Sequence, residues 1–165
     1  MKYFTSDILN LTTSYIKTTK NLPEFLDSLD KIEGNLFKET SAIYDTLFED
    51  ISYGMKSYIQ DVMKILGVSR GELREIISEL KQEVPNIHQV KFVLAFQPIP
   101  SFVDVLFLWV SNNLGKDLLV NYEVNASIIG GAIIIYKGRY LDYSSAPLIS
   151  KYFETHSSDV QTLLS

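Results

Sequence analysis

The 165-residue sequence contains no cysteine and only two histidines. The absence of cysteine excludes disulfides, thiolate catalysis and cysteine-ligated zinc, and two histidines are too few for a histidine-rich metal site. Basic residues are also in the minority, because 15 Lys and Arg face 20 Asp and Glu for a net charge of −5. Binding to a phosphate backbone needs a basic patch, so we expect no nucleic-acid partner.

The sequence also lacks a long hydrophobic run. Two apolar stretches, residues 102–110 and 128–136, are interrupted by Asp104 and by a glycine pair. Both are far shorter than the roughly 20 residues of a membrane-spanning helix. Asp7 precedes any apolar core of a signal peptide, so secretion is not indicated. We therefore expect a soluble protein that reaches a membrane only through a complex.

Charge divides the chain near Pro85. Residues 1–85 carry 10 basic and 14 acidic side chains, whereas residues 86–165 carry 5 and 6. The spacing of apolar residues changes at the same place. We predict an α+β protein with an N-terminal all-α helical bundle, residues 1–87, and a small α/β domain with a mixed sheet, residues 88–155. Residues 156–165 are predicted to form a frayed tail.

Apolar residues of the first part recur at intervals of three and four, which is typical of amphipathic helices. The pattern covers residues 8–15, 25–36 and 43–66, with Gly54 as a break and Gly67 as a stop. Ser69 and Glu72 have the spacing of a capping box ahead of a last stripe that Pro85 ends. This pattern predicts four or five helices in a bundle.

Strand-like and helix-like segments alternate in the second part. Residues 90–96 and 118–124 predict strands on either side of an apolar helix at residues 102–114. Residues 128–136 predict a third strand, and the Lys-Gly-Arg turn at 137–139 connects it to a fourth. Pro147 opens a closing helix.

Enzyme motifs are absent from the sequence. The glycine pair at 130–131 is not followed by Lys-Ser or Lys-Thr and is not part of a GxGxxG motif, so no phosphate-binding loop is predicted. Asp142, Ser144 and His156 could form a hydrolytic triad, but no serine lies in a Gly-x-Ser-x-Gly elbow. We predict no catalytic, cofactor-binding or metal-binding residue.

An acidic face at Asp27, Asp30 and Glu33 is the remaining charged feature of the first part. It could bind a cation or a basic partner. A solvated helix face is the commoner outcome for such a pattern.

Residues 124–144 carry a pattern that resembles a known family. The segment runs Val-Asn-Ala-Ser-Ile-Ile-Gly-Gly, then an apolar strand, Lys-Gly-Arg, and Leu-Asp-Tyr-Ser. This order is similar to the C-terminal signature of the delta subunit of F-type ATP synthases, which is equivalent to the mitochondrial oligomycin-sensitivity-conferring protein. The resemblance covers residues 88–154, and it extends to the first 85 residues only through their helical architecture, which looks about one helix short.

The resemblance implies a structural role for the signature residues. The glycines let a neighbouring element approach closely, and the Asp-x-Ser step bonds the turn and caps the last helix. These residues are Ile129, Gly130, Gly131, Asp142 and Ser144.

Two positions depart from the family pattern. Asn125 stands where Asp is usual, which removes a charge from the turn, and Tyr143 stands where Gly is usual. Because glycine favours positive φ, we expect the turn after Asp142 to differ in shape. These departures suggest a divergent member or a relative used in another assembly.

The resemblance implies a non-catalytic adaptor in a proton-translocating ATP synthase. In delta subunits the helical domain holds N-terminal segments of the alpha subunits of the catalytic head, and the C-terminal domain holds the end of the b-subunit stalk. No cofactor is needed for this role. The location implied is the cytoplasmic side of the plasma membrane, as a peripheral subunit, or its organellar equivalent.

By analogy with the family, the groove for the alpha segments lies between the first and last helices of the bundle. Candidate contacts there are Ile8, Leu11, Tyr15, Leu73, Ile77 and Leu80. For each of them internal core is the alternative. Candidate contacts with the stalk are Phe102, Leu106 and Trp109, and Trp109 is expected either between layers or facing a partner.

Two other functions remain open. The chain could be an adaptor of another rotary ATPase or of a secretion machine. It could also be a small enzyme or ligand-binding domain with a pocket against the sheet of residues 90–143, although only His88, His156 and a few carboxylates could build such a site.

Overall fold

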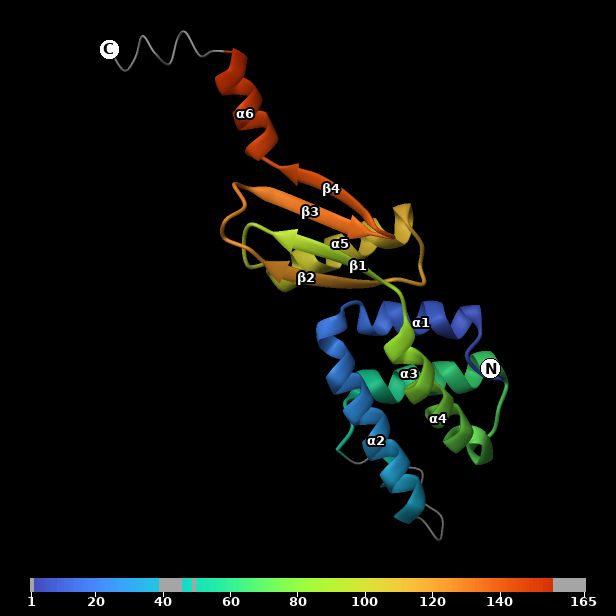
Figure 1. The fold of residues 1–165 in the computed structure, drawn as a ribbon. Coiled ribbons are helices and arrows are strands. Elements are labelled where there is room, and N and C mark those ends of the chain that lie inside the picture. Colours follow the sequence, from blue (N-terminus) through green and yellow to red (C-terminus); the bar gives the residue numbers. More distant parts are fainter. Residues whose placement is uncertain (1, 39–45, 49, 156–165) are drawn as a thin grey trace. The chain divides into compact units, whose positions relative to one another are not determined.

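A computed structural model describes residues 2–38, 46–48 and 50–155 of the chain. These residues form six α-helices and four β-strands, and four of the helices precede the first strand (Figure 1). The predicted α+β class is therefore confirmed. The tail predicted at residues 156–165 lies outside the described residues.

Contacts between residues divide the chain into two compact units. The first unit comprises Met1–Gln89 together with Asp104–Val120, and the second comprises Val90–Val103 together with Asn121–Ser165. Residues 104–120 thus group with the N-terminal helices, although they follow the first strand in sequence. The domain boundary that we placed between residues 87 and 88 stays a prediction.

Four amphipathic helices build the first unit around one apolar core. Their inward positions, such as Leu29 and Ile59, are fully buried, and Leu119 joins the same core from outside the bundle. Each helix buries one stripe, as the apolar spacing predicts. The helices are α1 (Ser6–Ile16), α2 (Leu22–Lys38), α3 (Tyr53–Leu66) and α4 (Leu73–Glu83).

Capping residues define the start and end of α3 and the start of α4. Ser52 accepts a hydrogen bond from the Met55 amide at 3.2 Å, so α3 begins next to the predicted break and Gly54 lies inside its first turn. Gly67 ends α3 with a φ of 62°, and the Ser69–Glu72 capping box precedes α4. The stop and the capping box that the sequence predicts are confirmed.

The segment before α1 is held on α4 by one carboxylate. The amides of Lys2, Tyr3 and Phe4 all donate to the Glu79 side chain, at distances between 3.0 and 3.2 Å. Burial raises the pKa of Glu79, but these amide hydrogen bonds outweigh it and lower the pKa below its ordinary value. The N-terminal segment is therefore tied to the bundle by a charge-assisted contact.

The end of α1 is linked to residues 104–120 within the first unit. Lys17 has a φ of 60°, its carbonyl accepts from the Val120 amide at 2.9 Å, and its ammonium pairs with Asp104 at 2.7 Å. The Thr13 hydroxyl donates to the Lys116 carbonyl at 2.6 Å. These bonds explain why residues 104–120 group with the helices.

The second part of the chain supplies a four-stranded mixed sheet in the order β2-β1-β3-β4. Strand β3 runs antiparallel to both β1 and β4, with Ile134 opposite Phe92 on one side and Leu141 on the other. The backbone amide of Asn125, which follows β2, donates to the carbonyl of Leu94, the last residue of β1, at 2.9 Å. The strands are β1 (Gln89–Leu94), β2 (Leu119–Val124), β3 (Gly131–Tyr136) and β4 (Arg139–Ser144).

The third strand is shorter than its apolar run predicts. It begins at Gly131, because Gly130 and Gly131 both have positive φ and bend the chain before the strand. The hairpin turn follows the prediction, with Lys137 and Gly138 at φ values of 48° and 74° between β3 and β4.

Two further helices, α5 (Pro100–Asn113) and α6 (Ala146–Thr155), complete the described chain. Helix α5 is apolar on most of its surface, and Phe107 and Val110 are its buried residues. Among the described helices, none combines the length and the apolar character needed to cross a bilayer.

Candidate partner-binding surfaces

Most of the six residues predicted to contact the alpha segments lie in the bundle core. Ile8 on α1 is 1% exposed, and three residues of α4 are 2% exposed or less. Internal core, the alternative weighed for each, describes their position in the free chain. The three residues of α4 are Leu73, Ile77 and Leu80.

Leu11 and Tyr15 are the two predicted contacts with accessible surface. Leu11 is partly buried against the core, whereas Tyr15 is 37% exposed. The Tyr15 ring stacks on Tyr58 with centroids 5.0 Å apart and lies 5.9 Å from Phe25. The contact role of all six residues stays a prediction, and Tyr15 is the one that a partner could reach most directly.

Tyr58 is the buried member of the aromatic group that it forms with Tyr15 and Phe25. Its hydroxyl shares a hydrogen bond of 2.7 Å with the buried Thr12 hydroxyl. Burial raises the pKa of Tyr58 well above its ordinary value, although the Thr12 hydrogen bond acts in the opposite direction. The phenol therefore stays neutral and holds the ring on which Tyr15 stacks.

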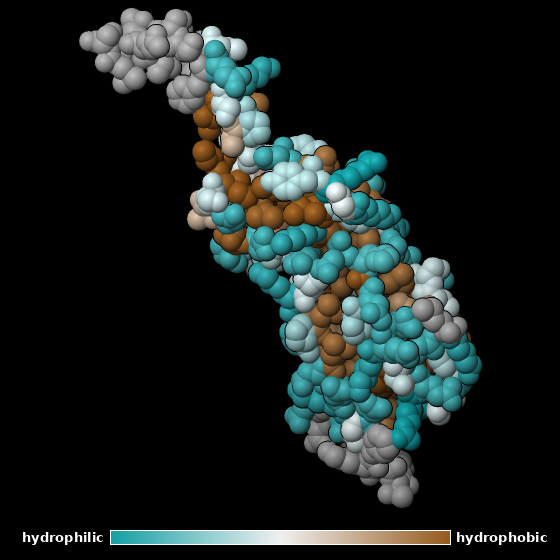
Figure 2. All heavy atoms as spheres, viewed as in Figure 1, coloured by the Kyte–Doolittle hydropathy of each residue, from teal (hydrophilic) through white to brown (hydrophobic). Residues whose placement is uncertain are grey.

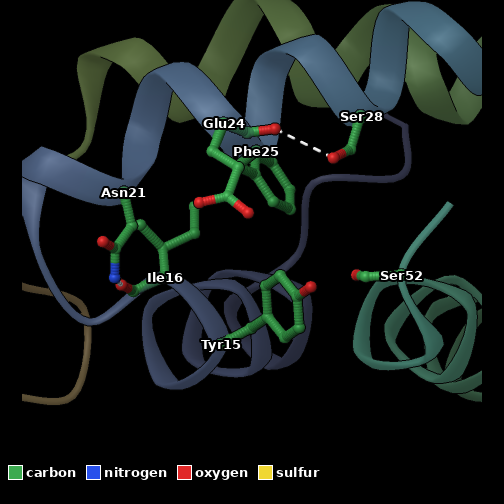
Figure 3. A pocket seen from close by; sticks show the side chains of 7 residues that line it. All are labelled: Tyr15, Ile16, Asn21, Glu24, Phe25, Ser28 and Ser52. Atoms are coloured by element: carbon green, nitrogen blue, oxygen red, sulfur yellow. Dashed lines mark hydrogen bonds between the residues drawn. The ribbon is translucent and has the colours of Figure 1, made fainter.

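A pocket of about 300 Å³ opens beside Tyr15 where α1, α2 and the start of α3 meet (Figure 3). Its aromatic members are Tyr15 and Phe25, and its only charged member among the described residues is Glu24. Sequence reasoning missed this pocket, because it found the Tyr15 position but not the α2 residues opposite. The other lining residues are Ile16, Asn21, Ser28 and Ser52.

Lysines compensate the acidic face of α2. Lys81 on α4 pairs with Asp30 at 2.5 Å and with Glu33 at 2.7 Å, and Lys31 pairs with Asp27 at 2.7 Å. Hydrogen bonds to Asp30 and Glu33 raise the pKa of Lys81. No group of three or more potential metal ligands occurs among the described residues. The solvated, paired helix face is the outcome observed.

The predicted stalk contacts lie on α5 with different exposures. Phe102 and Leu106 are partly buried, and Trp109 is 41% exposed. Val105 and Leu108, which sequence reasoning did not single out, are more exposed still, at 57% and 58%. Periodicity could not separate these positions, because apolar residues occupy most of the surface of α5.

The glycine pair of the signature segment packs against the C-terminal end of that segment. A Cβ at this position would lie 2.2 Å from the Tyr143 carbonyl oxygen and 3.0 Å from the Ser144 Cα, and its φ is +76°. Both backbone conformation and space therefore require glycine. At Gly130 a Cβ would meet the Ser145 hydroxyl at 3.0 Å. The close approach expected of the glycine pair is observed, with β4 as the neighbouring element.

Asp142 organises the end of β4. Its carboxylate accepts a hydrogen bond from the Ser144 amide at 2.8 Å, and contacts with the Ser144 hydroxyl and amide lower its pKa. This bonding of the turn agrees with the prediction. Ser145, rather than Ser144, immediately precedes α6, and its amide donates to the Ile129 carbonyl at 2.9 Å.

The two positions that depart from the family pattern have simple local geometry. Tyr143 lies inside β4 and is not among the residues with positive φ in the described chain. The expected difference of the turn from the family shape stays a prediction. The Asn125 side-chain oxygen accepts from the Ser127 amide at 3.0 Å and from its hydroxyl at 2.6 Å. A neutral amide oxygen makes these bonds without the charge of an aspartate.

Apolar side chains gather on the surface of the second unit. Figure 2 shows them over β3, β4 and the start of α6. Tyr140, Leu141 and Tyr143 of β4 are 61%, 46% and 64% exposed, and β4 is an edge strand of the sheet. Leu148 of α6 is 72% exposed. Exposed apolar surface of this extent is typical of an interaction site.

The described residues give no support to a hydrolytic triad of Asp142, Ser144 and His156. The Asp142 carboxylate bonds the Ser144 backbone, which positions a turn, and His156 lies outside the described residues. His88 is exposed, and its carbonyl accepts from the Leu119 amide at 2.9 Å.

Comparison with known proteins gives no further identification. No protein-family model matches the sequence, and no curated protein matches it.

Proposed function

We propose that the chain is a non-catalytic adaptor of the delta type, a peripheral-stalk subunit of a proton-translocating F-type ATP synthase. Its helical bundle binds N-terminal segments of the alpha subunits, and its second part binds the end of the b-type stalk subunit. The resemblance of residues 124–144 to the delta signature motivates this proposal.

The observation that carries the proposal is the packing of the Ile-Gly-Gly step of that signature against the end of β4. Gly131 faces the Tyr143 carbonyl with no room for a side chain, and the Ser145 amide donates to the Ile129 carbonyl. Residues that resemble a family signature are thus the ones on which the local fold depends. This agreement supports the resemblance, since scattered matches would not need to lie together.

Exposed apolar surface gives independent support for an adaptor. Trp109 and Leu108 on α5, and Tyr143 on β4, are large side chains that a free monomer gains nothing by exposing. Large aromatic and aliphatic residues are the usual anchors of protein interfaces. The family analogy assigns the α5 surface to the stalk.

The test uses synthetic peptides from the two expected partners. We expect the wild-type chain to bind an alpha N-terminal peptide and a b C-terminal peptide, but not peptides of scrambled sequence, in calorimetric titrations. Trp109→Ala should weaken the b peptide by about tenfold and leave the alpha peptide unchanged. Absence of binding of either one of the two peptides to the folded wild-type chain would contradict the proposal.

A further inference from the structure

The pocket beside α1 combines an exposed aromatic ring with a carboxylate. Its volume of about 300 Å³ is at the small end of the range for ligand pockets, which is about 300–1,000 Å³. Such a volume suits one long side chain better than a cofactor. Tyr15 lies on one wall and Glu24 on the other (Figure 3).

Tyr15 offers the pocket a ring that its neighbours hold in place. Stacking on Tyr58 at 5.0 Å covers part of the ring, and 37% of the residue remains accessible. The face of an aromatic ring carries negative electrostatic potential and attracts a cation placed within about 6 Å of its centre. A positively charged ligand is therefore favoured on this wall.

Glu24 offers the pocket a negative charge. Within the part of the chain that the structure describes, no hydrogen bond or ion pair engages its carboxylate. Figure 3 shows this carboxylate extending from α2 toward α1. Lys31, a basic residue further along α2, is already paired with Asp27 at 2.7 Å.

The polar residues at the rim of the pocket also favour a ligand that donates hydrogen bonds. The Asn21 amide group donates to the Ile16 carbonyl at 2.9 Å, and the Ser28 hydroxyl donates to the Glu24 carbonyl at 2.9 Å. These donors are directed to the backbone, while the Asn21 side-chain oxygen and the Glu24 carboxylate can still accept. None of the described residues that line the pocket is basic.

We propose that this pocket binds the guanidinium group of an arginine side chain on a partner polypeptide. A guanidinium is planar, so it can stack on the Tyr15 ring while its N–H groups donate to the Glu24 carboxylate. A lysine ammonium lacks the planar face for stacking. The chemistry of the pocket does not depend on the proposed function, and only the identification of the partner as an alpha segment rests on it.

The direct test is an NMR titration of the full chain with butylguanidinium, with butylurea as the neutral control of the same shape. We expect saturable shifts of the Tyr15 and Phe25 ring protons with butylguanidinium and none with butylurea. Glu24→Gln should weaken this binding by about threefold to tenfold. Asp61→Asn, which removes a carboxylate of α3 that does not line the pocket, should leave it unchanged.

Three results would overturn the assignment. They are the absence of a saturable shift with butylguanidinium, an equal saturable shift with butylurea, and unchanged affinity of Glu24→Gln for butylguanidinium while its circular dichroism matches that of the wild type. Binding of butylguanidinium without binding of the alpha peptide would contradict the proposed function and leave the arginine pocket standing. Binding of the alpha peptide without any butylguanidinium shift would contradict the arginine pocket and leave the proposed function standing.

Discussion

The helical bundle and the second unit differ in how many of their large apolar side chains are exposed. In the described parts of α1 to α4, the large apolar side chains are buried or half-buried except Tyr15, Tyr53 and Ile65. The second unit is built from a shorter, less charged sequence and exposes a larger set. That set is Phe96, Ile99, Val124, Ile129, Tyr140, Leu141, Tyr143, Leu148 and Ile149.

The two regions therefore differ in how much apolar surface they bury without a partner. The bundle satisfies its own apolar surface, and a partner can reach it mainly through the pocket at Tyr15. The second unit leaves apolar surface uncovered, which costs solubility and stability unless another protein covers it. The low charge of residues 86–165, which the average over the whole chain conceals, fits the interface that we propose.

The largest effect should come from Gly131→Val in the second unit. The new side chain would collide with the Tyr143 carbonyl and would need a positive φ, so we expect a loss of about 4 kcal/mol or more. Hydrogen exchange followed by mass spectrometry should show loss of protection in β1, β3 and β4 while α2 to α4 keep theirs.

Gly138→Val is the matched control for that glycine. Gly138 also has positive φ, at +74°, but nothing lies within 4 Å of its Cβ position. It should cost only about 1–2 kcal/mol through backbone strain. If limited proteolysis of Gly131→Val left both halves unaffected, the structural role of Gly131 would be wrong.

A smaller effect, confined to the bundle, should follow Ile77→Ala. Ile77 is fully buried, so the truncation leaves a cavity and should lower the free energy of unfolding by about 2–5 kcal/mol. Ile65→Ala on α3 makes the same chemical change at a residue that is 47% exposed, and it should cost about 0.5 kcal/mol or less. Equal loss in the two variants, measured by urea denaturation, would show that Ile77 is not core.

The smallest effect should come from Glu79→Gln, which tests the polar tie between the N-terminal segment and α4. Glu79 has a folded pKa below its ordinary value of 4.5, so its contribution to stability is present above pH 4.5 and is lost as pH falls through the folded pKa. At pH 7 the variant should be less stable by about 1 kcal/mol.

The pH dependence identifies the cause of that loss. The stability difference between wild type and Glu79→Gln should shrink as pH falls below 4.5 and should be lost once pH has passed the lower folded pKa, where the wild-type carboxyl is protonated in the folded state as well. Glu83→Gln, which removes the same charge from the end of α4, is the matched control for the loss of charge. A difference that stays constant down to pH 3 would argue against the amide contacts of Glu79.

Much of the fold follows from local patterns in the sequence. Intervals of three and four indicated α1 to α4 because each one buries a single stripe, and Gly67, the Ser69–Glu72 box and the hairpin turn act through neighbouring residues. The stripe predicted from residue 43 is α-helical only from Tyr53 onward, since Thr46–Phe48 form a 3₁₀ turn and residues 43–45 lie outside the described residues. The grouping of residues 104–120 with the bundle could not be predicted. It depends on long-range bonds such as those from Lys17 to Val120 and Asp104.

The candidate site was less predictable for the same reason. Helical spacing identified Tyr15 and Ile77 alike, but it cannot tell which apolar residue faces the core and which lies at a pocket. Glu24 was missed because a lone exposed glutamate has no local pattern, and its importance comes from the ring that α1 places opposite. Gly131 was recognised from the family resemblance, although the Tyr143 carbonyl that requires it was not.

The most direct test of the adaptor role is purification of the tagged, full-length chain from its native cells under mild detergent, followed by mass spectrometry. We expect the alpha, beta and b subunits of an F-type ATP synthase to be recovered together with it, and to be lost with Gly131→Val where the second part fails to fold. Recovery of a different ring ATPase, or of the chain alone from cells whose synthase is intact, would contradict the proposal.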